Sequence, residues 1–166
     1  KMKVLIVHNF YKVRAGEFSV LKNEIKLLKD NGNEVITFYK DNKNIKSFYS
    51  KVIYFLRIVY SKYIFKEFDY YLKQNKPDVI HVHNFFPIMT PAIFFAAKKN
   101  NIPIVHTLHN YRLICPTATL MHNNRIYEKS IINSPFSTII DKVYRNSYLG
   151  TFALARMISY HKKYNT

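Results

Sequence analysis

The chain has 166 residues, 48% of them hydrophobic, which fits one globular domain of ordinary size and excludes a disordered chain. Its 26 Lys and Arg residues outnumber its 10 Asp and Glu residues, and the formal net charge of +16 points to an acidic partner: nucleic acid, an anionic membrane or a phosphorylated ligand. One cysteine excludes a disulfide framework, and Arg57 interrupts the best candidate membrane span, so we expect a cytoplasmic protein.

Short apolar runs alternate with stretches of helical periodicity along the chain. In chain order, the predicted elements are a strand over 3–7, a helix over 17–30, a strand over 34–39, a helix or two over 47–75, a strand over 78–82, a helix over 90–100, a strand over 102–108, an irregular stretch over 110–134 and a helical stretch over 135–160. Strands that alternate with helices indicate an α/β fold, a Rossmann-like doubly wound parallel sheet, and we expect residues 3–7 inside it.

Two of the predicted strands end in histidines and an asparagine. Residues 77–84 read PDVIHVHN and residues 103–110 read PIVHTLHN. Ligands in open α/β sheets bind beyond the carboxyl ends of the strands, so both segments would deliver imidazoles and amides to one place. His81 and His83 are two residues apart on a strand and therefore face the same side. We expect His81 to pack within the sheet and His83 to reach a cleft.

The histidines also raise the question of zinc. His81, His83 and His106 carry suitable nitrogens, but a metal site needs a complete set of ligands. No further Cys or carboxylate has a suggestive spacing. The sequence therefore predicts neither a metal nor a cofactor.

These segments resemble the N-terminal domain of family 4 glycosyltransferases. The resemblance runs in the family's order and spacing through residues 2–9 (MKVLIVHN), 16–17, 23–24, 32–35, 77–83 and 106–116 (HTLHNYRLICP). It implies one half of a GT-B fold, in which the N-terminal Rossmann-like domain holds the acceptor and the C-terminal domain binds the nucleotide sugar. We therefore expect residues 1–166 to be a single acceptor-binding domain, and the nucleotide-sugar domain with its E-x7-E signature is absent from this sequence.

The resemblance also implies roles for particular residues. It places His109 at the reaction centre, where a neutral imidazole can hydrogen-bond a sugar hydroxyl; the residue types alone favour a structural histidine. It places Ala15 and Gly16, where the family usually has Gly-Gly, in a loop that faces the donor diphosphate; the alternative is a turn glycine. Relatives often carry further cysteines after the Cys-Pro pair, and their lack here favours a packing role for Cys115.

Other polar side chains lie at the predicted carboxyl edge of the sheet. Loops on a rigid scaffold carry binding residues, and Arg can clamp a phosphate or carboxylate with two hydrogen bonds. The alternative for each of these residues is ordinary solvated loop polarity. The candidates for acceptor binding are Arg14, His83, Asn84, Asn110, Tyr111 and Arg112.

The predicted helix over 47–75 contains ten aromatic residues and several cations. Lys51 and Lys62 lie at one edge of its apolar arc and Arg57 lies near the other, as in a helix whose long cations reach lipid headgroups. The alternative is a core helix with a cationic rim. We expect Lys51, Arg57 and Lys62 to face an anionic membrane, which would make the protein peripheral on the inner face of the cell membrane.

The resemblance thus implies a retaining hexosyltransferase that moves a sugar from a nucleotide donor to a cell-surface polysaccharide or glycolipid. Its partners would be a nucleotide sugar and a glycan or lipid-linked acceptor, and residues 1–166 alone would be inactive. Two alternatives stay open. The charge and the aromatic residues also fit a single-stranded nucleic-acid-binding module, although no recognised nucleic-acid motif is present. A membrane-surface scaffold without catalysis is the other.

Overall fold

The computed structural model describes residues 1–11, 16–41, 55 and 57–164. The chain divides into two compact units, one of residues 1–51 and 61–109 and the other of residues 52–60 and 110–166. The prediction that residues 1–166 form a single domain stays a prediction.

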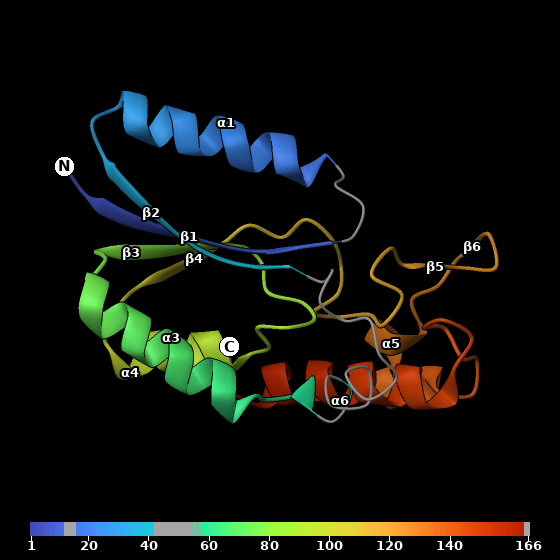
Figure 1. Ribbon diagram of the computed structural model, residues 1–166. Helices are drawn as coiled ribbons and strands as arrows, with labels where there is room; N and C mark the ends of the chain where they lie inside the picture. The colour runs from blue at the N-terminus through green and yellow to red at the C-terminus, as the bar shows by residue number, and fades with distance from the viewer. Residues whose placement is uncertain (12–15, 42–54, 56, 165–166) are drawn as a thin grey trace. The chain divides into compact units, whose positions relative to one another are not determined.

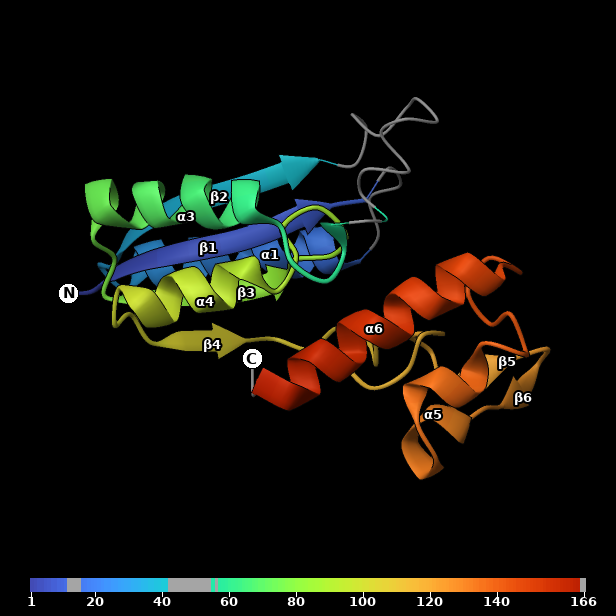
Figure 2. The same cartoon turned by 90° about the horizontal axis from the view of Figure 1, so that it is seen from below.

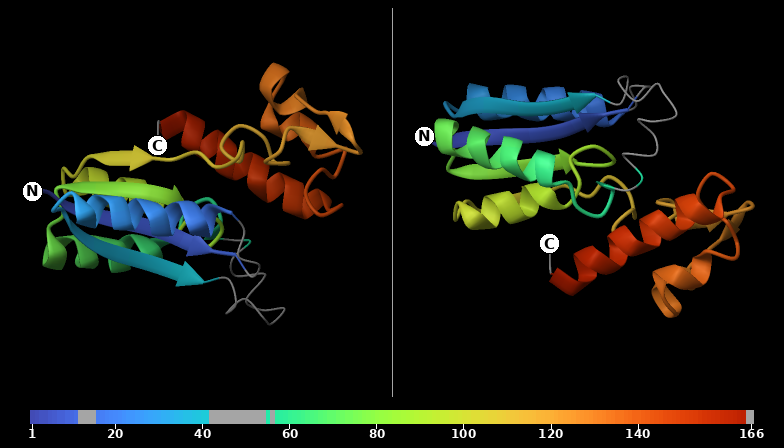
Figure 3. Two further views of the ribbon diagram at one scale, coloured as in Figure 1. Left: turned by 90° about the horizontal axis from the view of Figure 1, so that it is seen from above. Right: turned by 60° about the horizontal axis from the view of Figure 1, so that its bottom comes forward.

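The first unit is built on a four-stranded parallel sheet. Its strands are β1 (Lys3–Phe10), β2 (Glu34–Asp41), β3 (Val79–Asn84) and β4 (Ile104–His106), in the order β2-β1-β3-β4. All four run in the same direction (Figure 3). Residues 4–7 are buried because β1 lies inside the sheet, and strands buried on both faces read as continuous apolar runs. The predicted α/β fold and the interior place of residues 3–7 are confirmed.

Helices cover both faces of this sheet. Helix α1 (Glu17–Asp30) lies on one face, and helices α3 (Lys62–Asn75) and α4 (Ala92–Lys99) lie side by side on the other (Figures 1 and 2). On the α1 face, Val4 and Ile6 pack with Leu21, and Ile25 and Leu28 join them at helical spacing. The apolar periodicity of residues 17–30 therefore predicts both the bounds of α1 and the face that it buries.

All four strands differ in length from the sequence prediction. β1, β2 and β3 continue to Phe10, Asp41 and Asn84, so the polar residues at their ends lie in the sheet and not in loops, whereas β4 is shorter than the predicted 102–108. A strand predicted from an apolar run ends where the first polar residue occurs. In β1 and β3 the polar side chains stay buried within the sheet, mostly with partners inside the protein, so the strand pairing continues past them.

The aromatic stretch over 47–75 is described in the structure only at residue 55 and over 57–75. Helix α3 begins only at Lys62, where the Ser61 hydroxyl caps it by accepting a hydrogen bond from the Ile64 N–H at 3.3 Å. Its buried residues include Phe68 and Leu72, while several of its other side chains are exposed. Helix α3 thus buries one side and exposes lysines on another, and its contact with a membrane stays a prediction. Residues 42–54 and 56, and so Lys51, lie outside the described residues.

One carboxylate joins α3 to the end of α4. The side chain of Asp69 accepts hydrogen bonds from Lys73 at 2.9 Å, from Lys99 at 3.0 Å and from Asn100 at 2.8 Å. Lys73 contributes most to lowering the pKa of Asp69 from 3.8 to about 2, against the opposing effect of burial. This network fixes the helix layer on the face opposite α1.

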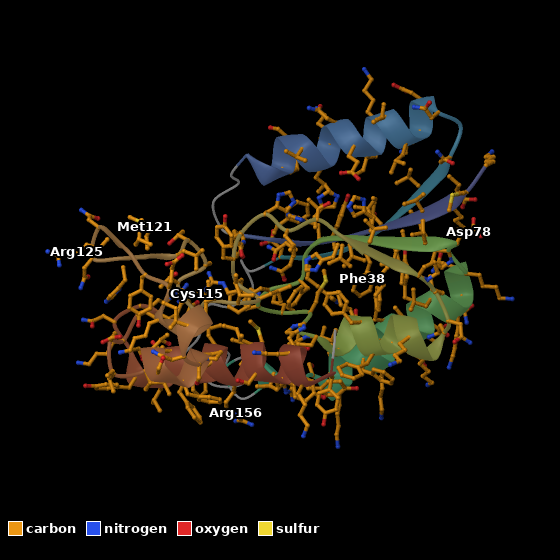
Figure 4. All side chains as sticks on the ribbon, turned by 180° about the vertical axis from the view of Figure 1, so that it is seen from behind. Phe38, Asp78, Cys115, Met121, Arg125 and Arg156 are labelled. Atoms are coloured by element: carbon orange, nitrogen blue, oxygen red, sulfur yellow. The ribbon has the colours of Figure 1, made fainter. Side chains whose placement is uncertain are left out.

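The second unit contains smaller elements and one long helix. They are β5 (Met121–His122) and β6 (Arg125–Ile126), which pair as an antiparallel hairpin, α5 (Lys129–Ile132), a 3-10 helix (Pro135–Thr138) and α6 (Tyr148–Tyr164). Figure 4 labels Met121 and Arg125 on the hairpin and Arg156 on α6. Cys115 is buried and lies 3.2 Å from the Thr117 hydroxyl, which fits the packing role expected for it.

Among the described residues, none of the helices combines the length and the apolar character needed to span a membrane.

The Asp69 network gives a testable stability prediction. Asp69→Asn should lower the free energy of unfolding at pH 7 by on the order of 1 kcal/mol, since Lys73 and Lys99 lose an ionic partner but are themselves half exposed and screened by water. The folded pKa is depressed, so this contribution is present above pH 3.8 and is lost as the pH falls towards 2.

Urea unfolding of the wild type and the variant over this pH range would measure it. Asp30→Asn, an exposed carboxylate at the end of α1, is the control. The role of the charge would be contradicted if wild type and Asp69→Asn had the same free energy of unfolding at pH 7. It would also be contradicted if their difference at pH 2 were as large as at pH 7.

Candidate functional site

Histidines from three neighbouring strands gather at the carboxyl end of the first unit's sheet. His8 belongs to β1, His81 and His83 belong to β3, and His109 follows β4. The ring of His83 lies between the others: its centroid is 4.4 Å from that of His81, 5.4 Å from that of His109 and 6.4 Å from that of His8. Parallel strands with adjacent ends produce this convergence, as the sequence predicts.

Helix α1 adds a carboxylate to this group. Glu24 comes three residues after Leu21 and four before Leu28, so it lies on the side of α1 that faces the sheet. Its Oε1 atom is 2.5 Å from His81 Nδ1. Its Oε2 atom is 3.2 Å from His83 Nε2, without the alignment of a hydrogen bond. His81 is also held on its other side, since its Nε2 is 2.8 Å from the Thr107 hydroxyl.

His83 lies deeper than His81, which reverses the expected arrangement. The side chain of His83 is 0% exposed and that of His81 is 13% exposed. The sequence shows that the two rings share a side of β3, but it does not show what covers that side. In the structure His83 packs between the rings of His81 and His109, so it does not reach a cleft as we expected.

Burial keeps two of these imidazoles neutral. It lowers the pKa of His83 from 6.5 to about 3, with His81 and His109 as the next causes, because neighbouring imidazoles disfavour a further positive charge. It likewise lowers the pKa of His8 to about 4, with His109 as the second cause. Among the described residues, no group hydrogen-bonds His8 Nδ1.

His109 is the outermost ring of the group. It is partly exposed, and its Nε2 lies 3.2 Å from Nδ1 of His83. Within the described residues no hydrogen-bond partner is found for its Nδ1. The group therefore presents one imidazole nitrogen, held from behind by a second imidazole, that can bind a ligand.

The same residues offer donors that a metal could use. One ligand atom each from Glu24, His81 and His83 lies within 4.8 Å of the others, and zinc takes imidazole and carboxylate ligands. The sequence analysis did not find this set, because the carboxylate comes from a different element. In the structure Glu24 and His81 bind each other at 2.5 Å. We therefore describe a hydrogen-bonded cluster, and the expectation of no metal stays a prediction.

Comparison with known proteins agrees with this fold. The profile of Glycosyltransferase Family 4 matches residues 19–157, which is most of the chain. The chain belongs to this family. A Klebsiella pneumoniae protein described as an "Uncharacterized 42.6 kDa protein in cps region" is 35% identical over 89 residues, which are 53% of this chain and 24% of that protein. The match thus spans about a quarter of that relative's length. No solved structure matches the chain.

Membership of Glycosyltransferase Family 4 confirms the resemblance seen in the sequence. The parallel sheet with helices on both faces is the Rossmann-like N-terminal half of a GT-B fold. The chain is a domain of Glycosyltransferase Family 4, and the histidine cluster lies at the edge of its sheet where open α/β folds bind ligands.

The glycosyltransferase domain's first loop is only partly described. Arg14 and Ala15 lie outside the described residues. Gly16 directly precedes α1 with φ −53° and ψ −27°, a conformation open to any residue, and an added Cβ would meet no described atom within 4 Å. Neither backbone strain nor packing against the described residues requires a glycine there. Its donor role stays a prediction.

The acceptor candidates have different surroundings. Asn84 is buried, its amide donates to the Asn9 carbonyl at 2.8 Å, and its oxygen accepts from the Phe86 N–H at 3.0 Å. Its described contacts therefore hold the end of β3 in place.

The three remaining acceptor candidates, Asn110, Tyr111 and Arg112, belong to the second unit. Asn110 accepts from the Arg112 N–H at 3.0 Å, and the Arg112 guanidinium donates to the Pro116 carbonyl at 2.7 Å and lies 5.4 Å from the Tyr144 ring. Tyr111 is exposed. The predicted convergence of this loop with His109 stays untested, as do the acceptor roles.

Sequence reasoning missed Glu24, His8 and Thr107 as parts of the site. The signal for Glu24 was available, because a carboxylate on the apolar side of an amphipathic helix needs a buried partner. His8 was assigned to a loop because it is the first polar residue after an apolar run. Thr107 carries no signal of its own, since its hydroxyl matters only through the register that places it beside His81.

The lowered pKa values predict an acid-sensitive cluster. The folded values of His8 and His83 lie below the ordinary 6.5, so between pH 6.5 and about 4 the unfolded chain takes up protons that the folded chain does not. Stability should therefore fall as the pH is lowered through this window, by at most about 1.4 kcal/mol per pH unit for each histidine.

Urea unfolding at several pH values would measure this slope. His8→Gln should flatten it, whereas His122→Gln, on the hairpin of the second unit, should leave it unchanged. A slope in His8→Gln as steep as that of the wild type would show that burial of this imidazole does not cause the acid sensitivity.

Proposed function

We propose that the protein is the acceptor-binding half of a retaining glycosyltransferase that transfers a sugar from a nucleotide donor to a cell-surface polysaccharide or glycolipid. The observation that carries this proposal is the place of His109 in a Glycosyltransferase Family 4 domain. Its ring is partly exposed at the carboxyl edge of the sheet and is held from behind by His83 at 3.2 Å. A held imidazole binds a reacting group with little reorganisation, which favours catalysis.

The role of His109 in this proposal is to hydrogen-bond a hydroxyl of the transferred sugar. The contact would strengthen as positive charge develops on the sugar ring, because the imidazole is already oriented. The donor diphosphate would approach Ala15 and Gly16, where the first N–H groups of α1 favour negative charge. In this proposal the nucleotide is bound mainly by a second domain, and residues 1–166 alone do not turn over.

The acceptor class rests on the relative from Klebsiella pneumoniae. That protein is described as lying in a cps region, which supports a polysaccharide as the product here. The proposed acceptor contacts come from Arg14, Asn84 and residues 110–112. We propose that His83 acts through His109, since its ring is buried. Family membership argues against the nucleic-acid alternative.

Replacement of His109 tests the proposal. In the full-length enzyme, His109→Ala should reduce sugar transfer roughly 100-fold, because a pre-oriented hydrogen bond to the reacting sugar is lost. Transfer would be measured as UDP or GDP release from a panel of UDP- and GDP-sugars, with a membrane lipid extract as acceptor.

His122→Ala is the matched control, and thermal unfolding of both variants would separate a catalytic loss from a folding loss. Near-normal turnover of a folded His109→Ala variant would refute the role of His109. A wild type that releases no nucleotide with any donor would refute the transferase assignment for this panel.

Peripheral membrane binding is the second part of the proposal. Tyr63 and Tyr70 are 64% and 67% exposed on the outer side of α3, and the exposed cations Arg57 and Lys62 lie close in sequence. Aromatic rings with long cations suit the headgroup region of an anionic membrane.

Liposome co-sedimentation tests this part. The protein should prefer anionic over neutral vesicles, and salt should weaken the preference because charge is screened within about 8 Å at physiological ionic strength. Replacing Lys51, Arg57 and Lys62 together with Gln should reduce binding, whereas Lys22→Gln and Lys26→Gln on α1 should not. Equal binding of both variants would mean that these cations serve another ligand.

A further inference from the structure

We propose that Glu24 is a positioning residue of this site: acting through His83, its carboxylate decides which nitrogen of His109 carries the proton. The consequence for sugar transfer rests on the proposed function. The arrangement of protons does not, since it follows from contacts within the first unit.

Two contacts connect Glu24 to His109. Glu24 Oε2 is 3.2 Å from Nε2 of His83, and Nδ1 of the same ring is 3.2 Å from Nε2 of His109. The His83 and His109 centroids are 5.4 Å apart, well beyond the 3.2 Å between their nitrogens, and the ring planes are inclined by 20°. The two nitrogens therefore lie between the ring centres, as they do when one imidazole donates to another.

The carboxylate decides the direction of that hydrogen bond. Two neutral imidazoles can share it either way, because each ring has one donor and one acceptor nitrogen, and a heavy-atom structure does not show which. A proton on His83 Nε2 is attracted by Glu24, whereas a lone pair there would face the carboxylate oxygen and be repelled. With its proton on Nε2, His83 accepts at Nδ1, so His109 donates from Nε2 and keeps its lone pair at Nδ1.

The carboxylate is itself held in place. Its other oxygen is 2.5 Å from His81 Nδ1, and His81 is fixed by the Thr107 hydroxyl at 2.8 Å. The backbone N–H of Thr107 donates to the Val82 carbonyl at 2.9 Å, so this support belongs to the sheet. Glu24 thus turns one oxygen to each of the two β3 histidines.

If His83 were protonated, Glu24 could no longer decide which nitrogen of His109 carries the proton, because an imidazolium donates from both nitrogens. The groups around the His83 ring disfavour this charged form. Burial is the main cause of its lowered pKa, and the imidazoles of His81, His109, His8 and His106 add to it, with Glu24 as the carboxylate nearest to the ring. The neutral ring, with its two unlike nitrogens, therefore transmits the choice from Glu24 to His109.

This arrangement gives the site a defined preference. The ligand-facing Nδ1 of a neutral His109 is an acceptor, so it suits a hydroxyl that donates and disfavours a phosphate oxygen or a carbonyl. Glu24 touches neither the ligand nor His109 and acts only through His83, in the way that groups behind a metal-bound histidine fix its tautomer.

The proton positions can be measured without a substrate. Two-bond nitrogen–proton NMR correlations of the 15N-labelled protein at pH 7 identify the protonated nitrogen of each histidine, and single His→Gln variants assign the signals. We expect the Nε2–H form for both His83 and His109 in the wild type. A wild-type His109 with its proton mainly on Nδ1 would overturn the proposal even if no variant folds.

The decisive variant is Glu24→Gln, with Asp30→Asn on the same helix as the charge-matched control. Glu24→Gln should shift the tautomer ratio of His109 severalfold towards Nδ1–H, and Asp30→Asn should leave it unchanged. A ratio that stays the same in a folded Glu24→Gln protein would overturn the proposal. So would micromolar binding of added Zn²⁺ that Glu24→Gln abolishes, because Glu24 would then be a metal ligand.

In the full-length enzyme, kcat and KM distinguish a positioning role of Glu24 from a merely structural one. Glu24→Gln should lower kcat for sugar transfer about 10-fold or more, with the KM for the donor nearly unchanged, since the orientation of His109 matters most in the transition state. A raised KM at unchanged kcat would count against positioning. A wild type with the expected tautomers but no transfer would refute the proposed function and leave the proton arrangement intact.

Discussion

The cost of burying imidazoles constrains the rest of this structure. Three histidine-bearing strand ends meet under one helix, and a charged imidazole in that position would lose its water without gaining enough partners. Burial therefore favours neutral rings at His8 and His83, and the orientation of these rings depends on the polar groups that reach them. Glu24 is the carboxylate that does so, and it reaches His81 and His83 only because α1 packs with Leu21, Ile25 and Leu28 against the sheet. The packing of α1 against the sheet thus both buries apolar side chains and brings Glu24 to the histidines.

The parts of the fold set by local periodicity were predictable from the sequence. The bounds of α1, the interior place of β1 and the shared side of His81 and His83 all follow from spacing. The relative depth of the two histidines does not, because it depends on which rings from other elements cover them. Glu24 was visible as a carboxylate on an apolar helix face, but its partner lies in a strand far along the chain. For α3 the sequence left a core helix and a membrane-facing helix both open, and the structure shows only that Ile64, Phe68 and Leu72 are buried.

The large positive charge of the chain does not come from the residues of the candidate site. The formal charge is +16, yet the ring that contacts His109 is the neutral imidazole of His83, which in turn lies beside the Glu24 carboxylate. The lysines of α1 and α3 are exposed, and Lys73 of α3 and Lys99 of α4 bind Asp69 as part of the fold. Net charge is an argument about long-range attraction and solubility, and it says little about which bond reacts. The composition could therefore indicate an acidic partner without indicating a transferase, which needed the strand-end residues.

A cluster supported by three strands and a helix has little freedom to change. Any shift of His109 must be followed by His83, whose ring is enclosed, and then by Glu24, whose helix is fixed by apolar packing. Positions outside the cluster, such as Gly16 and the segment after His109, are not bound by this constraint. Those are loop positions, where changes of side chain cost little stability. The first unit thus contains a rigid part that presents one imidazole nitrogen, whereas loop positions outside that part can change at little cost in stability.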